Sequence, residues 1–353
     1  MALSAQQLAQ FHAEGFLVLR QVLPEAALAP LRAEIEERVE MVAQEAVAAG
    51  QLAADKTFPS AQLDTRLALL AAACADPEWV WREAATNIYG KPHSRGMFIL
   101  RTAPQLLDLA ASAVGPEVLA HPQFALRAHL PRTTPSIIPW HQDLACASAR
   151  CSLALASPLV RSTLGHSRHT RYMNVWAAFD VGAMLPVEIL CVTDLQPETC
   201  STLIFNAWVP LVDADVANGC LAVQRYSHTQ GLLPHETSTE MQAVGGKGSR
   251  GLRAESTPAE EAPDVVAVEM RVGDVLLLME GTVHRSLPNT SPDRVRWSVD
   301  TRYNAAGEPN GRPHVPGFLA RSATRPGAVA KTAEEWQAIV TGGQEGATIR
   351  ARI

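Results

Sequence analysis

The sequence has no long apolar run, no concentrated basic stretch and no C-x-x-C cysteine pair. Its 353 residues are 47% hydrophobic and 19% charged, yet no apolar segment approaches the length of a membrane span. A net charge of −6 without a basic stripe argues against nucleic acid as a partner. We therefore expect a soluble globular protein that binds neither nucleic acid nor a membrane.

Targeting signals are also absent from the two ends of the sequence. The start, Met1-Ala2-Leu3-Ser4, lacks the basic residues and apolar core of a secretory signal. The last three residues, Ala351-Arg352-Ile353, are not a peroxisomal address. The expected location is the reducing cytoplasm, and the chain is long enough to bury a sizeable core in one large domain.

The first third of the chain is predicted to be mostly helical. Start and stop signals place helices after a Ser4–Gln7 capping box, between Pro24 and Gly50, after Asp76-Pro77, and from Thr102–Pro104 to Gly115. In the second of these, apolar residues alternate at spacings of three and four, as in a helix with one buried face: Leu28, Leu31, Ile35, Val39, Val42 and Ala46.

Strand signals dominate the rest of the sequence. A short strand is predicted from Phe16 to Leu19, and further strands are predicted to begin near Val118 and Phe124. From there the chain is mainly β until a last helix around Ala333 to Val340. The fold class is therefore α+β, mainly β with helices.

The tripeptide His141-Gln142-Asp143 follows an apolar run, Ile137–Trp140. Residues two apart on an extended segment point to the same side, so His141 and Asp143 converge while Gln142 turns away. His284 must then come from another strand, which requires a β-barrel or sandwich. Two imidazoles and one carboxylate can occupy one face of an octahedral ion and leave the opposite face open, which suits non-haem Fe(II) and oxygen.

Two strand-like runs are predicted in this part of the sequence. The first begins with Val275–Met279 and has His284 at its end, the second is Val295–Asp300, and the two runs are predicted to form an antiparallel pair. Arg296 opens the second run and can face the same cavity as the metal, where a planar guanidinium would suit a bidentate carboxylate. Arg294 would point to the same side of the strand as Arg296, so it is the alternative residue for binding this carboxylate.

These features resemble the phytanoyl-CoA dioxygenase family of Fe(II)/2-oxoglutarate oxygenases, over nearly the whole chain. The matching stretches agree in order and spacing: Phe11–Leu19, His141–Leu144, Asn206–Asp213, Asn218–Leu221, Gly231–His235 and His284–Tyr303. The resemblance implies a double-stranded β-helix core, which is a jelly-roll, cupin-like fold, with an N-terminal helical cover.

The resemblance also implies roles for individual residues. His141, Asp143 and His284 would bind iron, Arg296 would hold the distal carboxylate of 2-oxoglutarate, and Trp208 would line the cosubstrate pocket. An aromatic residue in an apolar strand is often core, so Trp208 is equally compatible with packing alone. The implied reaction consumes 2-oxoglutarate and O2, releases succinate and CO2, and hydroxylates a small-molecule substrate that the sequence does not identify.

The chain departs from the family pattern at an insertion of residues 146–200, where the family usually has a short loop. Such a length in a compact domain indicates either a functional lid or an excursion without a role, and we favour the excursion. Four of the six cysteines lie there at irregular spacings, which argues against a zinc site. Asn174-Val175-Trp176 echoes Asn206-Ala207-Trp208, but only the second copy continues into the family pattern.

The predicted organisation is one domain over residues 1–353. Residues 1–116 form the mostly helical cover, residues 117–304 the β core interrupted at about 146–200, and residues 305–353 a C-terminal extension. The leading hypothesis is an Fe(II)- and 2-oxoglutarate-dependent hydroxylase. Because the insertion follows Asp143 closely, the alternative is a metal-binding or catalytically impaired family member that acts as a binding protein.

Overall fold

A computed structural model describes residues 2–88, 92–131, 137–143, 173–178, 184–189, 204–237, 250–259, 261–308 and 315–350. The chain divides into two compact units, Met1–Ala145 with Thr202–Ile353, and Cys146–Ser201. In the second unit, strands β3 (Met173–Ala178) and β4 (Met184–Ile189) pair antiparallel. The predictions of a lid, an excursion or a zinc site otherwise fall outside the described residues.

Local sequence signals set the ends of the helices. The capping box before α1 forms as predicted, because the Ser4 hydroxyl accepts the Gln7 backbone N–H and the Gln7 side chain accepts the Ser4 N–H. The apolar stripe predicted between Pro24 and Gly50 is buried along α2. The main helices are α1 (Ala5–Glu14), α2 (Glu25–Ala48), α3 (Arg66–Ala73), α4 (Pro77–Asn87), α5 (Arg95–Arg101), α6 (Pro104–Val114) and α10 (Ala333–Arg350).

The four N-terminal helix predictions are confirmed as α1, α2, α4 and α6, and the last helix as α10, which runs beyond Val340. Helices α3 and α5 have no predicted counterpart. Among the described residues, no helix combines the length and apolarity needed to cross a membrane.

The larger of the two facing sheets has six strands in the order β1-β10-β5-β12-β2-β13, and neighbouring strands are antiparallel. The predicted strand at Phe16–Leu19 forms one edge, and the starts predicted near Val118 and Phe124 belong to one continuous strand. The strands are β1 (Phe16–Leu19), β10 (Val275–Met279), β5 (Phe205–Pro210), β12 (Arg296–Ala305), β2 (Val118–His129) and β13 (Phe318–Arg321).

The predicted direct pairing of Val275–Met279 with Val295–Asp300 is wrong. These runs form β10 and β12, and β5 lies between them, paired antiparallel to both. The reason is that the chain leaves the larger sheet after β10 and enters the smaller one through β11 (His284–Ser286) before it returns as β12. This path places His284 in the smaller sheet.

The smaller sheet has the order β11-β6-β9, with β6 at Leu221–Gln224 and β9 at Val265–Val268. A buried apolar cluster that includes Phe16, Trp208, Leu276 and Leu278 from the larger sheet and Leu221, Val223 and Val268 from the smaller one fills the space between them. A short hairpin, β7 (His235–Thr237) with β8 (Arg250–Leu252), lies outside both sheets. The predicted mainly β, jelly-roll core with helices is confirmed.

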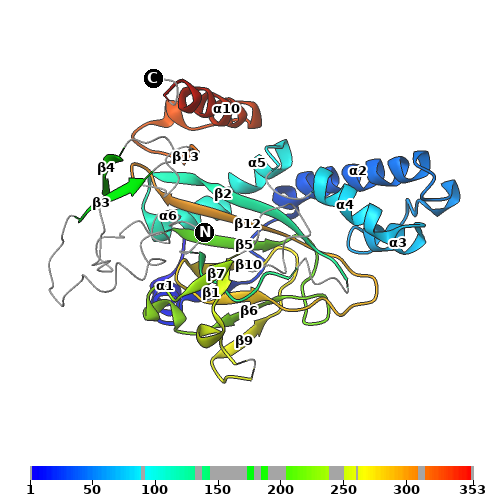
Figure 1. Cartoon of the computed structure of the whole chain (residues 1–353), viewed down its shortest axis with the longest axis horizontal. Helices are drawn as coiled ribbons and strands as arrows, with labels where there is room; N and C mark the ends of the chain where they lie inside the picture. The colour runs from blue at the N-terminus through cyan, green and yellow to red at the C-terminus, as the bar shows by residue number, and fades with distance from the viewer. Residues whose placement is uncertain are drawn as a thin grey trace. The chain divides into compact units, whose positions relative to one another are not determined.

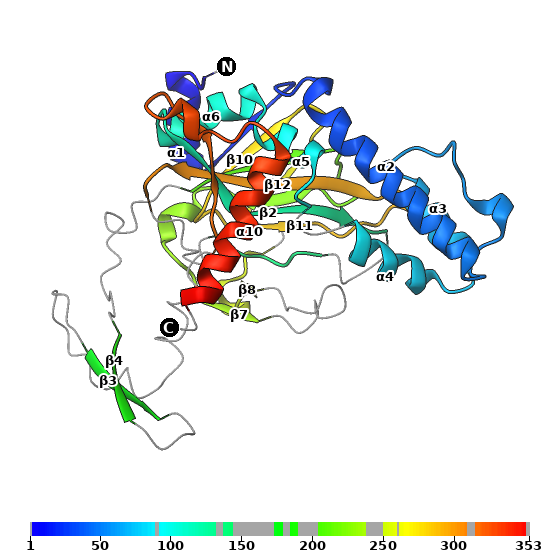
Figure 2. The same cartoon turned by 90° about the horizontal axis from the view of Figure 1, so that it is seen from above.

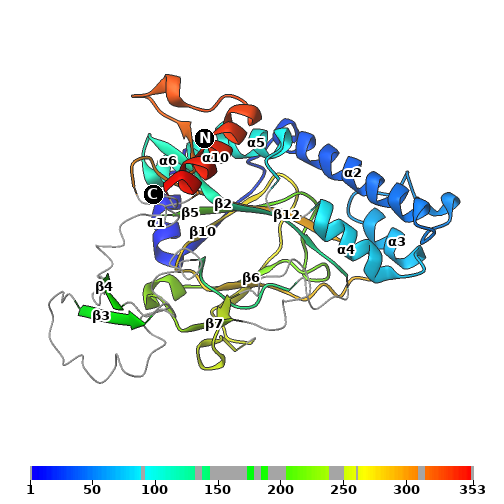
Figure 3. The ribbon, with the colours of Figure 1, turned by 45° about the horizontal axis from the view of Figure 1, so that its top comes forward.

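Helices cover the outer face of the larger sheet. Figures 1 and 3 show α5, α6 and α10 on one side of β2, β5 and β12, with β6 on the other side. Figure 2 shows α10, in red, crossing over β2 and β12, where Trp336 packs on Phe124 and Phe318. The helical cover therefore leaves the inner face of this sheet available for the site.

Candidate metal centre

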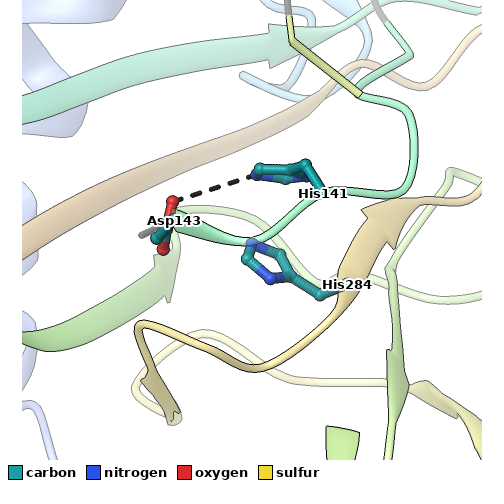
Figure 4. A group of neighbouring side chains, drawn as sticks. All are labelled: His141, Asp143 and His284. Atoms are coloured by element: carbon teal, nitrogen blue, oxygen red, sulfur yellow. Dashed lines mark ion pairs between the residues drawn. The ribbon is translucent and has the colours of Figure 1, made fainter. Parts of the chain in front are cut away.

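The three residues predicted to bind a metal meet between the two sheets. His141 and His284 form an isolated antiparallel bridge, in which each backbone N–H donates to the other's carbonyl at 3.0 Å. Their ring centroids lie 4.2 Å apart, and His141 Nε2 lies 3.9 Å from Asp143 Oδ1. One donor atom from each residue lies within 4.8 Å of the others, and Figure 4 shows the three side chains facing a common space.

Both imidazoles are oriented by a backbone carbonyl two residues earlier. His141 Nδ1 lies 2.9 Å from the Pro139 carbonyl, and His284 Nδ1 lies 2.9 Å from the Thr282 carbonyl. Because a carbonyl only accepts, each Nδ1 carries a hydrogen, and Nε2 is the ring nitrogen left to act as a metal ligand. Burial, with the neighbouring His284, lowers the pKa of His141 to about 3, so this ring is neutral at physiological pH.

Gln142 turns away from the metal side, as predicted, and fixes the surrounding loops. Its side-chain amide donates to the carbonyls of Gly231 and Gly281 at 2.8 and 2.7 Å and accepts the Leu233 backbone N–H at 2.8 Å. The residue is fully buried. The segment that presents His141 and Asp143 is therefore tied on both sides by a satisfied buried amide.

Two donors hold the Asp143 carboxylate. The Asn206 amide donates to Oδ2 and the Arg302 guanidinium donates to Oδ1. Burial raises the pKa of Asp143, but the adjacent Arg302 charge, the two nearby histidines and the Arg302 hydrogen bond together outweigh burial and hold the pKa well below its usual range. Asp143 is therefore ionised, as a metal ligand must be.

Arg296 is a buried cation without an acidic partner among the described residues. It is 2% exposed, and its guanidinium donates only to the hydroxyls of Ser298 and Ser286, at 3.1 and 3.2 Å, while Nε has no partner. Burial lowers the pKa of Arg296 to about 10, so the group stays charged at neutral pH. A buried charge of this kind is costly unless an anion joins it.

The same cavity contains the predicted residues and several apolar side chains. Trp208 lies in its lining, with the Arg296 guanidinium 5.3 Å from the ring centroid. Ile138, Leu221 and Leu278 add an apolar surface. Arg294 lies elsewhere: it forms a bidentate ion pair with Asp215 at 2.7 and 3.0 Å and does not line the cavity.

Sequence reasoning missed the role of Arg302 and its neighbour Asp300. Both line the cavity, together with Arg127, whose Nε donates to Asp300 Oδ1 at 2.6 Å. Strand parity gives the signal, because Arg302 lies six residues after Arg296 and shares its face of β12. The strand prediction ended at Asp300 and so excluded it.

Comparisons with known proteins agree on one family. The sequence model of the phytanoyl-CoA dioxygenase (PhyH) family matches residues 11–181 and 192–297 of this chain. A 1-deoxypentalenic acid 11-beta-hydroxylase from Streptomyces exfoliatus is 33% identical over 108 residues, which cover 30% of this chain and 37% of that protein. A phytanoyl-CoA dioxygenase from Arabidopsis thaliana is 26% identical over 157 residues, covering 43% of this chain and 48% of that one. The matches thus span less than half of either relative.

The fold also has a counterpart among solved structures. The non-heme monooxygenase ThoJ, in its nickel complex, superposes with a TM-score of 0.50 at 17% identity, covering 98% of this chain and 96% of that one. Similarity at this level of identity concerns the arrangement of the strands and helices.

Proposed function

This chain belongs to the phytanoyl-CoA dioxygenase family, and from that premise we propose that it is an Fe(II)- and 2-oxoglutarate-dependent dioxygenase that hydroxylates a small molecule. The observation that carries the proposal is the convergence of His141, Asp143 and His284 beside a buried guanidinium that lacks an acidic partner, Arg296.

The residues fit the metal that the family uses. His141 and His284 present two imidazoles to the site, and the ionised Asp143 carboxylate completes a set of three ligands of the kind that non-haem Fe(II) accepts. We assign His141, Asp143 and His284 as these ligands. When bound, Fe(II) with 2-oxoglutarate and O2 supplies the oxidation: one oxygen atom enters a C–H bond of the substrate and the other enters succinate, with release of CO2.

Arg296 fits the distal carboxylate of 2-oxoglutarate. Its guanidinium shares the cavity with the three ligands, and the two serine hydroxyls fix its direction without neutralising its charge. A carboxylate that accepts from this fork would remove the cost of the buried charge. Trp208 packs against the same guanidinium and restricts its position, so we assign it a supporting role in the cosubstrate pocket.

The apolar part of the cavity supports a substrate with a hydrocarbon portion. Ile138, Leu221 and Leu278 line the cavity together with the charged residues, and they would exclude water where a substrate packs against them. Excluding water strengthens the electrostatic contacts in the site and limits side reactions. A substrate that places an apolar carbon against these side chains would present a C–H bond near the three ligands.

Succinate formation tests this proposal. Purified protein is supplied with Fe(II), 2-oxoglutarate and air, alone and with a panel of small apolar and acyl compounds. We expect succinate from the wild type and from Arg294→Met, and none above background from His141→Ala, Asp143→Ala or His284→Ala. Wild-type succinate production by Asp143→Ala would show that the ligand assignment is wrong. A failure of the wild type to form succinate with any compound would favour the alternative of a binding protein.

A further inference from the structure

Two buried side chains from the larger sheet donate hydrogen bonds to the Asp143 carboxylate, one to each oxygen. Asn206 donates to Oδ2 and Arg302 donates to Oδ1. The two residues lie directly opposite each other in the register of β5 and β12, so they present their side chains on the same face of the sheet. Asn206 is 2% exposed and Arg302 is 5% exposed.

These two hydrogen bonds link the two sheets of the sandwich at the candidate metal site. His141 bridges to His284, which belongs to the smaller sheet. Asp143, in contrast, is bound through its side chain to β5 and β12 of the larger sheet. The position of the carboxylate relative to the two imidazoles therefore depends on Asn206 and Arg302 as much as on the backbone that carries Asp143.

The two contacts differ in what they mean for a metal ion. Oδ1 is the oxygen that lies 3.9 Å from His141 Nε2, so Arg302 occupies the side of the carboxylate that faces the imidazole. Asn206 is neutral and holds the other oxygen. An amide on the far oxygen orients a ligand without opposing a cation, whereas a guanidinium on the near oxygen opposes a cation.

Arg302 also belongs to a chain of alternating charges. Its Nη1 lies 3.7 Å from Asp300 Oδ2, and Asp300 in turn accepts from Arg127. Asp143 is 4% exposed, and a buried carboxylate without a charged partner would strongly destabilise the fold when no metal is bound. Arg302 supplies the compensating charge.

We propose that Asn206 and Arg302 are a positioning pair with opposite effects on the metal: Asn206 fixes Asp143 in its ligating orientation, and Arg302 neutralises Asp143 until the metal binds. This inference rests on the proposed function, because it assumes that Asp143 is a metal ligand. The opposite signs distinguish it from a shared structural role, in which losing either side chain would weaken the site.

Titration of the full chain with Co(II) alone, followed by absorption, tests the pair. Asn206→Leu should weaken Co(II) binding about tenfold or more, because the carboxylate loses its orienting donor. Arg302→Met should tighten Co(II) binding about tenfold, because a cation that competes for the same oxygen is gone. The metal-free Arg302→Met protein should also unfold at a lower temperature, and Co(II) should recover most of that loss.

Three further variants keep the result interpretable. Asn206→Ser and Arg302→Gln are milder changes that should shift Co(II) affinity in the same directions, and they replace Asn206→Leu and Arg302→Met if those variants fold poorly. Arg294→Met is the control, because it removes an ion pair outside the site and should leave Co(II) affinity unchanged. Weaker binding in both the Asn206 and Arg302 variants, or unchanged binding in either, would overturn the proposal. Those outcomes concern only the pair, whereas a wild type that fails to bind Co(II) would overturn the proposed function itself and the pair's role with it.

Discussion

At the scale of single residues, the decisive comparison is between two arginines two positions apart. Arg294 satisfies its charge with Asp215 at the protein surface, with 30% of its side chain exposed. Arg296 is buried beside the candidate metal ligands and donates only to hydroxyl groups. The sequence did not decide which of the two binds 2-oxoglutarate, because both point to the same side of the strand. Only the folded structure distinguishes the paired, partly exposed charge of Arg294 from the buried charge of Arg296, which has no acidic partner among the described residues.

This difference predicts unequal effects on 2-oxoglutarate binding. Arg296→Leu should weaken 2-oxoglutarate affinity more than tenfold, since losing a buried bidentate charge pair costs about 2 to 5 kcal/mol. Arg294→Leu should cost at most about 1 kcal/mol, because its ion pair is partly exposed. Calorimetric titration of the metal-loaded variants with 2-oxoglutarate measures both. Equal losses would refute the assignment of Arg296, and a larger loss for Arg294→Leu would transfer the role to that residue.

Glu280 gives a prediction about pH. Burial raises the pKa of Glu280 to about 7 from an ordinary value of 4.5, and the Asp143 charge adds to this shift. Between pH 4.5 and about pH 7, Glu280 is ionised in the unfolded chain but still protonated in the folded protein. The free energy of unfolding of the metal-free protein should therefore fall as the pH rises through this range. Glu280→Gln should remove that fall and be more stable than wild type at pH 8 by about 1 to 3 kcal/mol.

Chemical denaturation of both proteins at pH 4.5 and pH 8 measures this effect. Other titrating groups are common to the two proteins, so the difference between them isolates Glu280. A difference that is the same at both pH values would contradict the raised pKa.

At the scale of elements, local signals predicted helices well and sheet order poorly. Start signals such as the Ser4 capping box and the Asp76-Pro77 pair act within a few residues, and the predicted starts of α1, α2, α4 and α6 agree with the structure. The position of β5 between β10 and β12 depends on contacts across more than sixty residues, which no local pattern encodes. The site shows the same division: the candidate metal ligands were predicted from a motif, whereas the contacts of Asn206 and Arg302 with Asp143 depend on the pairing of β5 with β12.

Helix α5, which has no predicted counterpart, gives a test of element packing. Glu34 on α2 accepts from the Gly96 backbone N–H at 2.6 Å, and a Cβ on Gly96 would lie 2.6 Å from the Leu31 backbone. Gly96→Ala should therefore destabilise the protein by about 1 to 3 kcal/mol through overpacking. Gly327→Ala, where a Cβ meets nothing within 4 Å, should be close to neutral. Thermal unfolding compares the two, and equal midpoints would contradict the close approach of α2 and α5.

At the scale of the whole molecule, the main unit contains both sheets and the candidate metal centre without residues 146–201. The chain leaves this unit just after Asp143 and returns just before Asn206, and the side chains of these two residues are hydrogen-bonded. Asp143 and Asn206, which are described on either side of this segment, are therefore close together, so a short connection can join the two parts of the main unit.

Replacing residues 147–196 with a short Gly/Ser linker should accordingly preserve Co(II) and 2-oxoglutarate binding and keep or raise the unfolding temperature. A shorter loop costs less entropy to close, and the contacts that hold Asp143 come from β5 and β12. If the segment were a lid, ligand binding would survive, but 2-oxoglutarate consumption without substrate hydroxylation would increase. Loss of Co(II) binding would contradict the expectation that the main unit is sufficient.

The most direct test of the central claim is an anaerobic absorption titration with Fe(II) and 2-oxoglutarate together. If His141, Asp143 and His284 bind the metal beside Arg296, the wild type should develop a weak visible metal-to-ligand charge-transfer band that requires both additions. His284→Ala should show no such band. The account would be contradicted by a wild type without the band at saturating concentrations, or by a band that persists unchanged in His284→Ala.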